Sequence, residues 1–224
     1  MKLLKRKLRS FDIQVQDLVL HISAGGDVNE ESRAAALSFW EQLQAYALRN
    51  PAVRTSKRPI RVPEDAPPVV RELVRAAGTA GVGPMFSFRG ALTDHVGRFL
   101  ARSTSELTVS CGGDYFIVAR KRRKLTVHRT PDGRTIAVVV RPSREGVGVS
   151  TAFGSGRAPV DGLAVLASSC MLADAAAAGV QALLSKPDGF HVALDYLKKV
   201  PGVDGGLLLQ GDRIGVAGGV EIAA

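Results

Sequence analysis

The sequence is poor in cysteine and histidine, with two cysteines and four histidines in 224 residues. Neither Cys111 nor Cys170 belongs to a Cys-x-x-Cys pair or has a histidine at metal-ligand spacing. The sequence therefore predicts no zinc site and no disulfide framework, and this cysteine usage favours a reduced, cytoplasmic setting. No nearby histidine would activate Cys111 as a nucleophile, so we expect a structural thiol there.

Long hydrophobic runs are also absent. Basic residues interrupt the N-terminal segment MKLLKRKLRS, and no stretch approaches the roughly 20 apolar residues that span a membrane. The sequence thus favours neither export nor a membrane anchor. Because 46% of the residues are hydrophobic, the chain can bury a full core, and we expect a single domain over residues 1–224, with N-terminal elements in 1–80 and the motif-bearing core in 81–224. The sequence does not determine whether the chain forms a homo-oligomer.

Acidic residues are fewer than basic ones, 21 against 30. The net charge is +4 over residues 1–80, +7 over residues 81–145 and −2 over residues 146–224. Much of the excess is the run from Arg120 to Lys124, whose composition is typical of a solvated hairpin end. Phosphate binding by this run is the alternative. Aromatic residues make up only 5% of the chain, which argues against a base-stacking platform, and we do not expect nucleic acid as a partner.

Strand and helix patterns follow one another in blocks. Alternating apolar residues predict strands within residues 8–24, and helical spacing predicts a helix with Asn29 as N-cap and Trp40 in the core. A proline-rich connection leads to two helices, one within residues 67–82 with Gly78 near its end and one over residues 83–100. Strand-like segments follow, with a turn predicted at Pro131-Asp132-Gly133, and short strands close the chain. Blocks without regular βαβ alternation predict an α+β domain in which an antiparallel sheet packs against helices.

The stretch from Gly146 to Leu184 combines a loop, a strand and a helix of small residues. The segment GVGVSTAFGSGR predicts a loop rich in glycine and hydroxyl groups, and VDGLAVLASSC predicts a buried strand. The alanine run that begins at Ser168-Ser169 predicts a capped helix that another backbone can approach closely. Asp174 falls within about the first turn of this helix, where free amides and the helix dipole favour negative charge. We expect the loop, Asp174 and the helix start to share one pocket.

Two other segments place charged residues beside glycine. Arg89, Gly90 and Asp94 lie within about one turn of a helix. They predict either a close helix–helix contact at Gly90 with a surface ion pair, or a phosphate-facing helix with a cation and a carboxylate. The run Gly112-Gly113-Asp114 predicts a tight turn or a site of close backbone approach.

The order of these motifs resembles the ApbE superfamily, whose described members are magnesium-dependent FAD:protein FMN transferases. The resemblance is closest to its short branch without a signal sequence, uncharacterised protein family 0280, and spans roughly residues 81–179. It implies a T-fold-related antiparallel sheet. The matching segments are Ala80-Gly81-Val82-Gly83-Pro84-Met85 for A-G-V-G-P-M, Arg89-Gly90 with Asp94 for K-G-x-x-x-D, Cys111-Gly112-Gly113-Asp114 for G-G-D, Ser150-Thr151-Ala152-Phe153-Gly154 for the T-S-G loop, and Ala173-Asp174-Ala175 for A-D-A-x-x-T.

The resemblance implies a role for each matching segment. Asp174 and the backbone carbonyl of Phe88 would hold Mg²⁺, and Arg89 would offset the phosphate charge of FAD. Asp161 or Asp94 would be the carboxylate available for proton transfer. The other cofactor-binding positions would be Gly90, Gly112, Gly113, Asp114, Ser150 and Thr151.

Two parts of the transferase site have no counterpart. Ala178 stands where the family has a threonine ligand, and alanine offers Mg²⁺ no side-chain oxygen. The family's H-x-x-D-P segment corresponds to F-G-S-G-R-A-P-V-D, which contains no histidine. Three hypotheses follow: a retained nucleotide or flavin pocket with a degenerate catalytic site, an active Mg²⁺-dependent FMN transferase acting on FAD and a protein acceptor, or a non-catalytic scaffold or nucleic-acid-associated protein.

Overall fold

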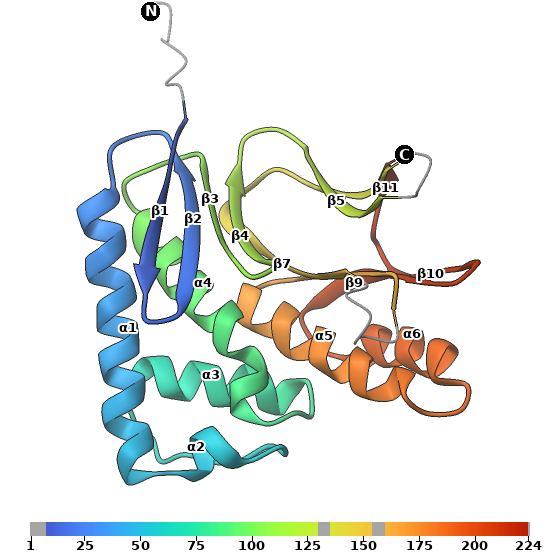
Figure 1. Ribbon diagram of the computed structural model, residues 1–224, viewed down its shortest axis with the longest axis horizontal. Coiled ribbons are helices and arrows are strands. Elements are labelled where there is room, and N and C mark those ends of the chain that lie inside the picture. The colour runs from blue at the N-terminus through green and yellow to red at the C-terminus, as the bar shows by residue number, and fades with distance from the viewer. Residues whose placement is uncertain (1–7, 130–134, 154–159, 224) are drawn as a thin grey trace, which may run out of the picture.

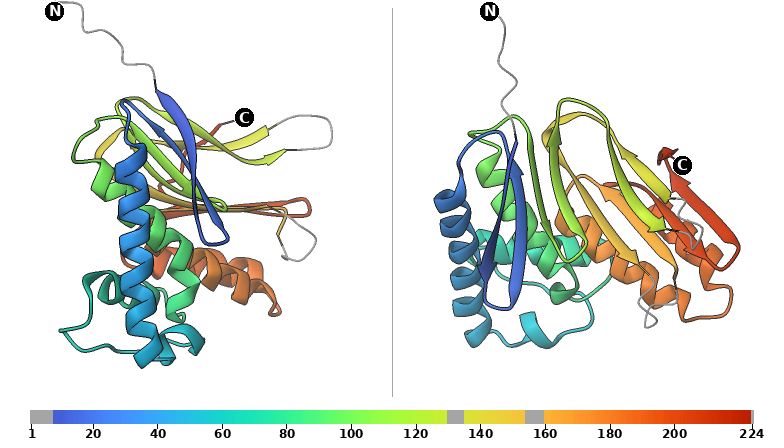
Figure 2. Two further views of the ribbon diagram at one scale, coloured as in Figure 1. Left: turned by 60° about the vertical axis from the view of Figure 1, so that its left-hand side comes forward. Right: turned by 45° about the horizontal axis from the view of Figure 1, so that its top comes forward.

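The computed structural model describes residues 8–129, 135–153 and 160–223, and these ranges form three layers (Figures 1 and 2). The middle layer is an eight-stranded sheet in which all neighbours are antiparallel. The predicted α+β class with an antiparallel sheet is confirmed. In spatial order the strands are β1 (Arg9–Val15), β2 (Leu18–Ala24), β3 (Leu107–Cys111), β4 (Asp114–Ala119), β7 (Ser143–Phe153), β8 (Gly162–Ala167), β9 (Val203–Gln210) and β10 (Arg213–Gly218).

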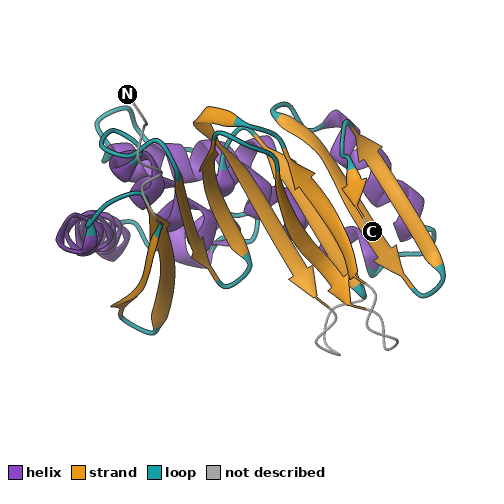
Figure 3. Ribbon diagram, turned by 90° about the horizontal axis from the view of Figure 1, so that it is seen from above, coloured by secondary structure: helices purple, strands orange, loops and turns teal. Residues whose placement is uncertain are grey.

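The helices cover one face of this sheet, as Figure 3 shows from above. Among them α4 and α5 lie centrally, and α1 flanks the β1–β2 hairpin (Figure 1). Within the described ranges, no helix is both long and apolar enough to cross a membrane. The helical segments are α1 (Asn29–Arg49), α2 (Ala52–Thr55), α3 (Pro68–Thr79), the 3-10 helix η1 (Pro84–Ser87), α4 (Phe88–Leu100), α5 (Cys170–Leu184) and α6 (Gly189–Lys199).

A three-stranded sheet covers part of the other face (Figure 2). Its strands, in spatial order, are β11 (Ile222–Ala223), β6 (Thr135–Val140) and β5 (Arg123–Arg129). Apolar side chains of β4, β7, β8 and β9 pack against β5 and β6 and form a core between the sheets.

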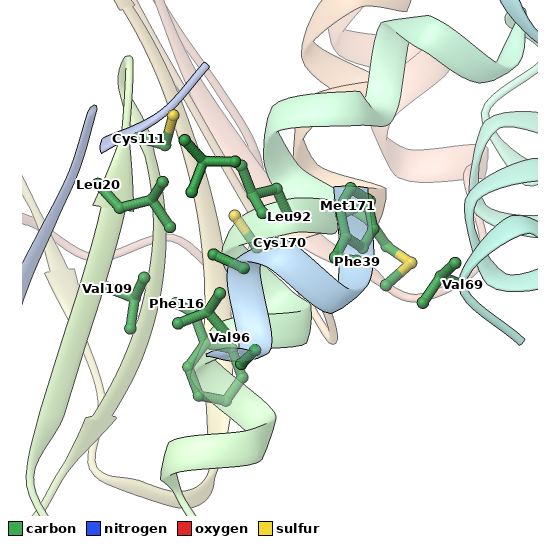
Figure 4. Close-up of a cluster of buried hydrophobic side chains, with 14 of the residues drawn as sticks. Leu20, Phe39, Val69, Leu92, Val96, Val109, Cys111, Phe116, Cys170 and Met171 are labelled. Carbon is green, nitrogen blue, oxygen red and sulfur yellow. The ribbon is translucent and has the colours of Figure 1, made fainter. Parts of the chain in front are cut away.

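Two further cores lie between the large sheet and the helices. One joins β1–β4 to α1, α3 and α4, and the other joins β8 and β9 to α5 and α6. Apolar burial of this kind is the main favourable term in folding. Figure 4 shows part of the first core, where side chains of the sheet and of α4 meet: Leu20, Val109, Phe116, Leu92 and Val96.

Strand β8 is buried along its whole length. Leu163 and Val165 face the helices, whereas Ala164 and Leu166 face the three-stranded sheet. Because successive side chains of a strand point to opposite faces, a strand covered on both sides is apolar at every position. The buried strand predicted within VDGLAVLASSC is confirmed, although it covers only Gly162–Ala167.

The segment from Gly146 to Arg157 was predicted as a loop, and this is wrong for its described part. Strand β7 runs from Ser143 to Phe153, while residues 154–159 and the Pro-Asp-Gly turn predicted at 131–133 lie outside the described residues. A Cβ on Gly148 would lie 2.0 Å from the carbonyl carbon of Ser169. Gly148 therefore lets the start of α5 pack directly on the strand.

The two predicted N-caps have different outcomes. The Ser169 side chain accepts a hydrogen bond from the Leu172 amide at 3.2 Å, which confirms a capped start for α5. Asn29 is the first residue of α1 and makes no cap hydrogen bond; its side chain accepts from Arg33 Nε at 2.9 Å. The Asn29 prediction is therefore wrong, because the acceptor that would cap α1 is bound one turn along the helix.

Candidate functional site

Helices α4 and α5 meet at Gly90. The Gly90 amide donates a hydrogen bond to Asp174 Oδ2 at 2.9 Å. A Cβ on Gly90 would lie 2.4 Å from the Cys170 carbonyl oxygen and 2.7 Å from Asp174 Cβ. Only glycine allows this approach, so the close helix contact offered by the sequence as one alternative is present. The surface ion pair expected with it is wrong, because Arg89 pairs with Asp114 and Asp94 is buried.

Asp94 links the same two helices from the other side of Gly90. Its carboxylate is fully buried, and Oδ2 accepts a hydrogen bond from the Met171 amide at 3.0 Å. The second oxygen lies 3.8 Å from Arg98 Nε and has no hydrogen-bond partner among the described residues. Burial raises the pKa of Asp94 to about 6. Asp94 thus holds the start of α5, and the structure does not bring it to the cavity described below.

The corner Gly112-Gly113 joins β3 to β4 and has positive φ angles of 57° and 100°. The Gly113 carbonyl accepts hydrogen bonds from the Thr151 amide at 2.8 Å and from Thr151 Oγ1 at 3.0 Å. A Cβ on Gly113 would lie 2.6 Å from the Thr151 carbonyl oxygen. The predicted tight turn is confirmed, and it fixes Asp114, the next residue, beside β7.

Asp114 forms an ion pair with Arg89 across the site. Arg89 Nε lies 3.3 Å from Asp114 Oδ2, and the Asp114 side chain is only 2% exposed, against 51% for Arg89. Burial raises the pKa of Asp114 to about 6, while Ser150 and Arg89 hold it down. Gly112 lies under Arg89, since a Cβ there would come within 3.2 Å of Arg89 Cδ.

Asp174 is the more strongly perturbed carboxyl. Burial and, to a smaller extent, the charge of Asp114 raise its pKa to about 8, against the opposing effects of the Gly90 amide and Arg89. At neutral pH Asp174 therefore holds a proton for most of the time.

These residues surround a cavity of about 490 Å³. Its polar wall carries Arg89, Asp174, Ser150 and Thr151. Asp17, Gln44, Arg54 and Gln181 add to the polar lining, and the apolar lining includes Trp40, Leu43, Met85, Phe86 and Phe88. A cavity of this size that combines apolar side chains with convergent polar groups is typical of a small-molecule site.

Five of the residues predicted for the site line this cavity, and four stand directly behind its wall. Those in the lining are Phe88, Arg89, Ser150, Thr151 and Asp174. Those behind it are Gly90, Gly112, Gly113 and Asp114, through the contacts given above.

Asp161 does not belong to this group. It is exposed, and its Oδ2 accepts a hydrogen bond from the Gly211 amide at 2.6 Å in the turn between β9 and β10. His128 Nδ1 lies 3.2 Å from the Asp161 carbonyl oxygen on the same side. Asp161 therefore orders this turn and has no route to the cavity.

Sequence reasoning missed several lining residues. Trp40 was assigned to the core, yet it is only partly buried and lines the cavity as well. Arg54, Gln44 and Gln181 were not singled out. For Gln181 a signal existed, because it lies seven residues, or two helical turns, after Asp174 on the same face of α5.

The cavity offers few oxygen ligands for Mg²⁺, which prefers six. Asp174 Oδ2 is already bound by the Gly90 amide, and Ala178 lines the cavity without an oxygen. Helical geometry directs the Phe88 carbonyl toward the amide four residues on. The described part of the chain contains no group of three or more His, Cys, Asp or Glu that could hold a metal ion. The residues present therefore do not supply the ligand set that the resemblance implies.

Both thiols are inert. Cys111 and Cys170 are buried and free. Burial raises the pKa of Cys111 to about 11 and that of Cys170 well above its ordinary value. Since the thiolate is the nucleophile, this agrees with the structural role expected for Cys111.

Comparison with known structures defines the class of protein. The fold matches the flavin transferase ApbE from Vibrio cholerae with a TM-score of 0.61 and 13% identity, over 97% of each chain. It also matches the apo form of the Pseudomonas stutzeri flavinyl transferase ApbE with a TM-score of 0.60 and 16% identity, over 100% of this chain and 96% of the other. The ApbE-like fold predicted from the motifs is confirmed.

Sequence comparison then identifies the family. Residues 1–192 match the family described as "AbpE bacteria", to which the chain belongs, and its curated relatives place it in the UPF0280 branch. A UPF0280 protein from Methanopyrus kandleri is 31% identical over 221 residues, covering 92% of this chain and 88% of the relative. One from Methanosarcina acetivorans is 26% identical over 217 residues, covering 92% and 85%.

Proposed function

We propose that the cavity between α4, α5 and β7 binds a flavin nucleotide such as FAD, and that the chain does not transfer FMN from it. One observation carries the proposal: a cation, a buried carboxyl and two hydroxyl residues line one cavity together with aromatic and aliphatic side chains. The structural neighbours named flavin transferases support the choice of ligand class.

Each part of a flavin nucleotide could contact lining residues of suitable chemistry. The flat ring system would pack against Trp40 and Phe88, and the sugar hydroxyls would hydrogen-bond to Ser150 and Thr151. Arg89 would bind phosphate, because Asp114 occupies only its Nε and no described residue bonds its terminal nitrogens. The raised pKa of Asp174 would reduce its repulsion of phosphate. The lining holds one further carboxylate, Asp17, and one further cation, Arg54.

Transfer lacks two of its chemical parts. The Mg²⁺ ligand set is incomplete at Ala178. The family's histidine has no counterpart in the sequence, Asp94 is buried under α5, and Asp114 is paired with Arg89. These observations support a pocket that has kept binding and lost catalysis.

Titration calorimetry with FAD, FMN and riboflavin tests the binding. Arg89→Gln should weaken the affinity for FAD about tenfold, because a hydrogen bond to a charged group is worth about 1.5–3 kcal/mol. The affinity for riboflavin, which has no phosphate, should change little. Arg71→Gln, an exposed arginine of α3, is the matched control and should leave both unchanged. If the wild-type chain binds none of the three, the scaffold hypothesis holds instead.

An active transferase is the second candidate, favoured by the position of Asp174 in the cavity wall. In that reaction a hydroxyl oxygen of a protein acceptor attacks the FMN phosphorus, the P–O bond to AMP breaks, and the hydroxyl proton leaves. Incubation with FAD, Mg²⁺ and acceptor peptides containing serine or threonine, with AMP detection, decides between the two. AMP formation that is lost in Asp174→Asn would establish the transferase; FAD binding without AMP supports our proposal.

We also propose that the chain acts in the cytoplasm, because both cysteines are unpaired thiols. Fractionation of the native cell followed by immunodetection would test this.

A further inference from the structure

A second hollow lies at the other end of α4. It has a volume of about 930 Å³, larger than the central cavity, and three separate segments form it: residues 101–105 after α4, residues 118–120 at the end of β4, and residues 142–144 at the start of β7. Because α4 has 13 residues and rises about 1.5 Å per residue, roughly 20 Å separate this arginine groove from Arg89.

Each of the three segments contributes one arginine to the groove: Arg102, Arg120 and Arg144. All three are exposed, and no aspartate or glutamate is among the lining residues. Arg120 donates a hydrogen bond to the neutral Ser105 Oγ at 2.7 Å. Neither Arg102 nor Arg144 has an ion pair within the described ranges. Three guanidinium groups thus share one hollow without a protein counter-charge.

Three of the acidic residues nearby already form ion pairs, whereas the exposed Glu145, next to Arg144, does not line the groove. Glu106, next to the first segment, lies 3.5 Å from Arg123, and Asp94 pairs with Arg98. Arg122 pairs with Glu221 at 2.6 Å. The arginines of the basic run, predicted as a solvated hairpin end, therefore have different surroundings. Arg122 and Arg123 form ion pairs with glutamates, whereas Arg120 lines the groove together with arginines from distant parts of the chain.

We propose that the arginine groove binds the phosphodiester backbone of single-stranded nucleic acid. The planar guanidinium fork matches the geometry of phosphate oxygens, and three forks in one hollow match successive phosphates of one strand. Phe99 is 42% exposed and lies beside Arg102, whose guanidinium stands 5.9 Å from its ring centre. An exposed aromatic ring next to a cation offers a stacking surface for an unpaired base. A groove between chain segments admits a single strand more readily than a duplex.

Fluorescence anisotropy with labelled single strands of about 12 nucleotides, as RNA and as DNA, tests the proposal. The groove variant is R102Q/R120Q/R144Q, and the matched control is R33Q/R49Q/R71Q, which removes the same charge from exposed positions of α1 and α3. The groove variant should bind at least tenfold more weakly and lower the salt slope by about 2, since each phosphate contact on a single strand contributes about 0.7. The control should stay within about threefold of wild type.

An equal loss of nucleic-acid affinity in both triple variants would overturn the proposal, because net charge alone would then explain binding. The proposal would also be overturned if wild-type binding did not depend on salt, or if the wild-type chain did not bind either strand. The ratio of RNA to DNA affinity identifies the natural strand. FAD titration of the groove variant should match wild type, which separates this result from the central cavity. If the triple variant fails to fold, Arg102→Gln and Arg144→Gln are tested singly, because neither has a protein ion pair.

Discussion

At the scale of single residues, the missing side chain at Gly90 sets the distance between α4 and α5. The Gly90 amide reaches Asp174 because no Cβ stands between it and the Cys170 carbonyl. One backbone position therefore determines both the helix packing and the hydrogen bond of the buried carboxyl in the cavity.

Replacement of Gly90 by alanine should destabilise the protein by about 1–3 kcal/mol, because the added Cβ meets backbone atoms that cannot move cheaply. In a chain of this size each kcal/mol lowers the melting temperature by about 2–4 °C. Gly78→Ala is the control, since nothing lies within 4 Å of a Cβ there, and it should leave the melting temperature unchanged or slightly raised. Similar melting temperatures for both variants would contradict the close helix contact.

The proton on Asp174 makes stability depend on pH. Burial raises its pKa from 3.8 to about 8, so between these values the folded chain binds a proton that the unfolded chain has released. This contribution to the unfolding free energy is complete below about pH 4 and is lost as the pH rises through about 8. The substitution Asp174→Asn keeps the shape of the side chain but removes the group that binds and releases the proton. The melting temperature of the variant relative to wild type should therefore rise steadily from about pH 4 to about pH 8 and stay high at about pH 9.

Circular dichroism melts across this range would measure the effect, with the exposed carboxylate variant Asp212→Asn as control. A constant difference between Asp174→Asn and wild type at every pH would mean that Asp174 titrates normally in the folded chain.

The sequence could not show which carboxylates reach the cavity. Asp94 meets the Met171 amide, 77 residues away, and Asp161 meets the Gly211 amide, 50 residues away. Neither partner is visible in a local pattern. Arg89 and Asp174 line the cavity as expected. These two could be predicted because each belongs to a motif whose order along the chain resembles that of the family.

At the scale of elements, side chains from two segments hold the start of α5. Ser169 Oγ accepts the Leu172 amide at 3.2 Å, and Asp94 Oδ2 accepts the Met171 amide at 3.0 Å. Two of the four amides that a helix start leaves unpaired are therefore satisfied. Because Asp174 follows one turn later, these caps also position the cavity's carboxyl.

Ser169→Ala should cost about 1 kcal/mol of unfolding free energy, the usual value of an N-cap. Ser185→Ala provides a control at the other end of the same helix, where the hydroxyl makes only a 3.5 Å contact with the Gln181 carbonyl. That change should cost less than about 0.5 kcal/mol. Urea denaturation would measure both, and a larger loss for Ser185→Ala would show that the cap at Ser169 does not carry the helix start.

Strand β7 shows where element prediction from sequence ends. Its GVGV segment has the glycine content of a loop, but both glycines serve close packing within a strand. Gly148 makes room for Ser169, and a Cβ on Gly146 would lie 2.3 Å from the Phe116 ring. By contrast, β8 could be predicted because an unbroken apolar run is itself the local signature of a strand covered on both faces.

At the scale of the whole molecule, the eight-stranded sheet packs apolar side chains on both faces. Leu207 of β9 is fully buried in the core between the sheets, whereas Ile214 of β10 is 61% exposed. Trp40, the single tryptophan of the chain, lies on α1 near the opposite edge of the sheet (Figure 1).

Leu207→Ala should lose about 2–5 kcal/mol, as buried leucine truncations do, and Ile214→Ala should lose less than about 0.5 kcal/mol. If the three layers unfold as one cooperative unit, Trp40 fluorescence and far-ultraviolet circular dichroism should give the same shifted midpoint for Leu207→Ala. Separate midpoints would mean that the two ends of the sheet unfold independently.

Strand β8 pairs with β7 on one side and β9 on the other, and its side chains are buried on both faces. Its backbone amides can therefore exchange with deuterium only when the entire molecule opens, whereas those of the edge strands β1 and β10 exchange through local fraying. The rate of deuterium uptake by residues 162–167 should consequently report the rate of global unfolding. A bound ligand that slows this uptake therefore stabilises the whole fold and not its own site alone.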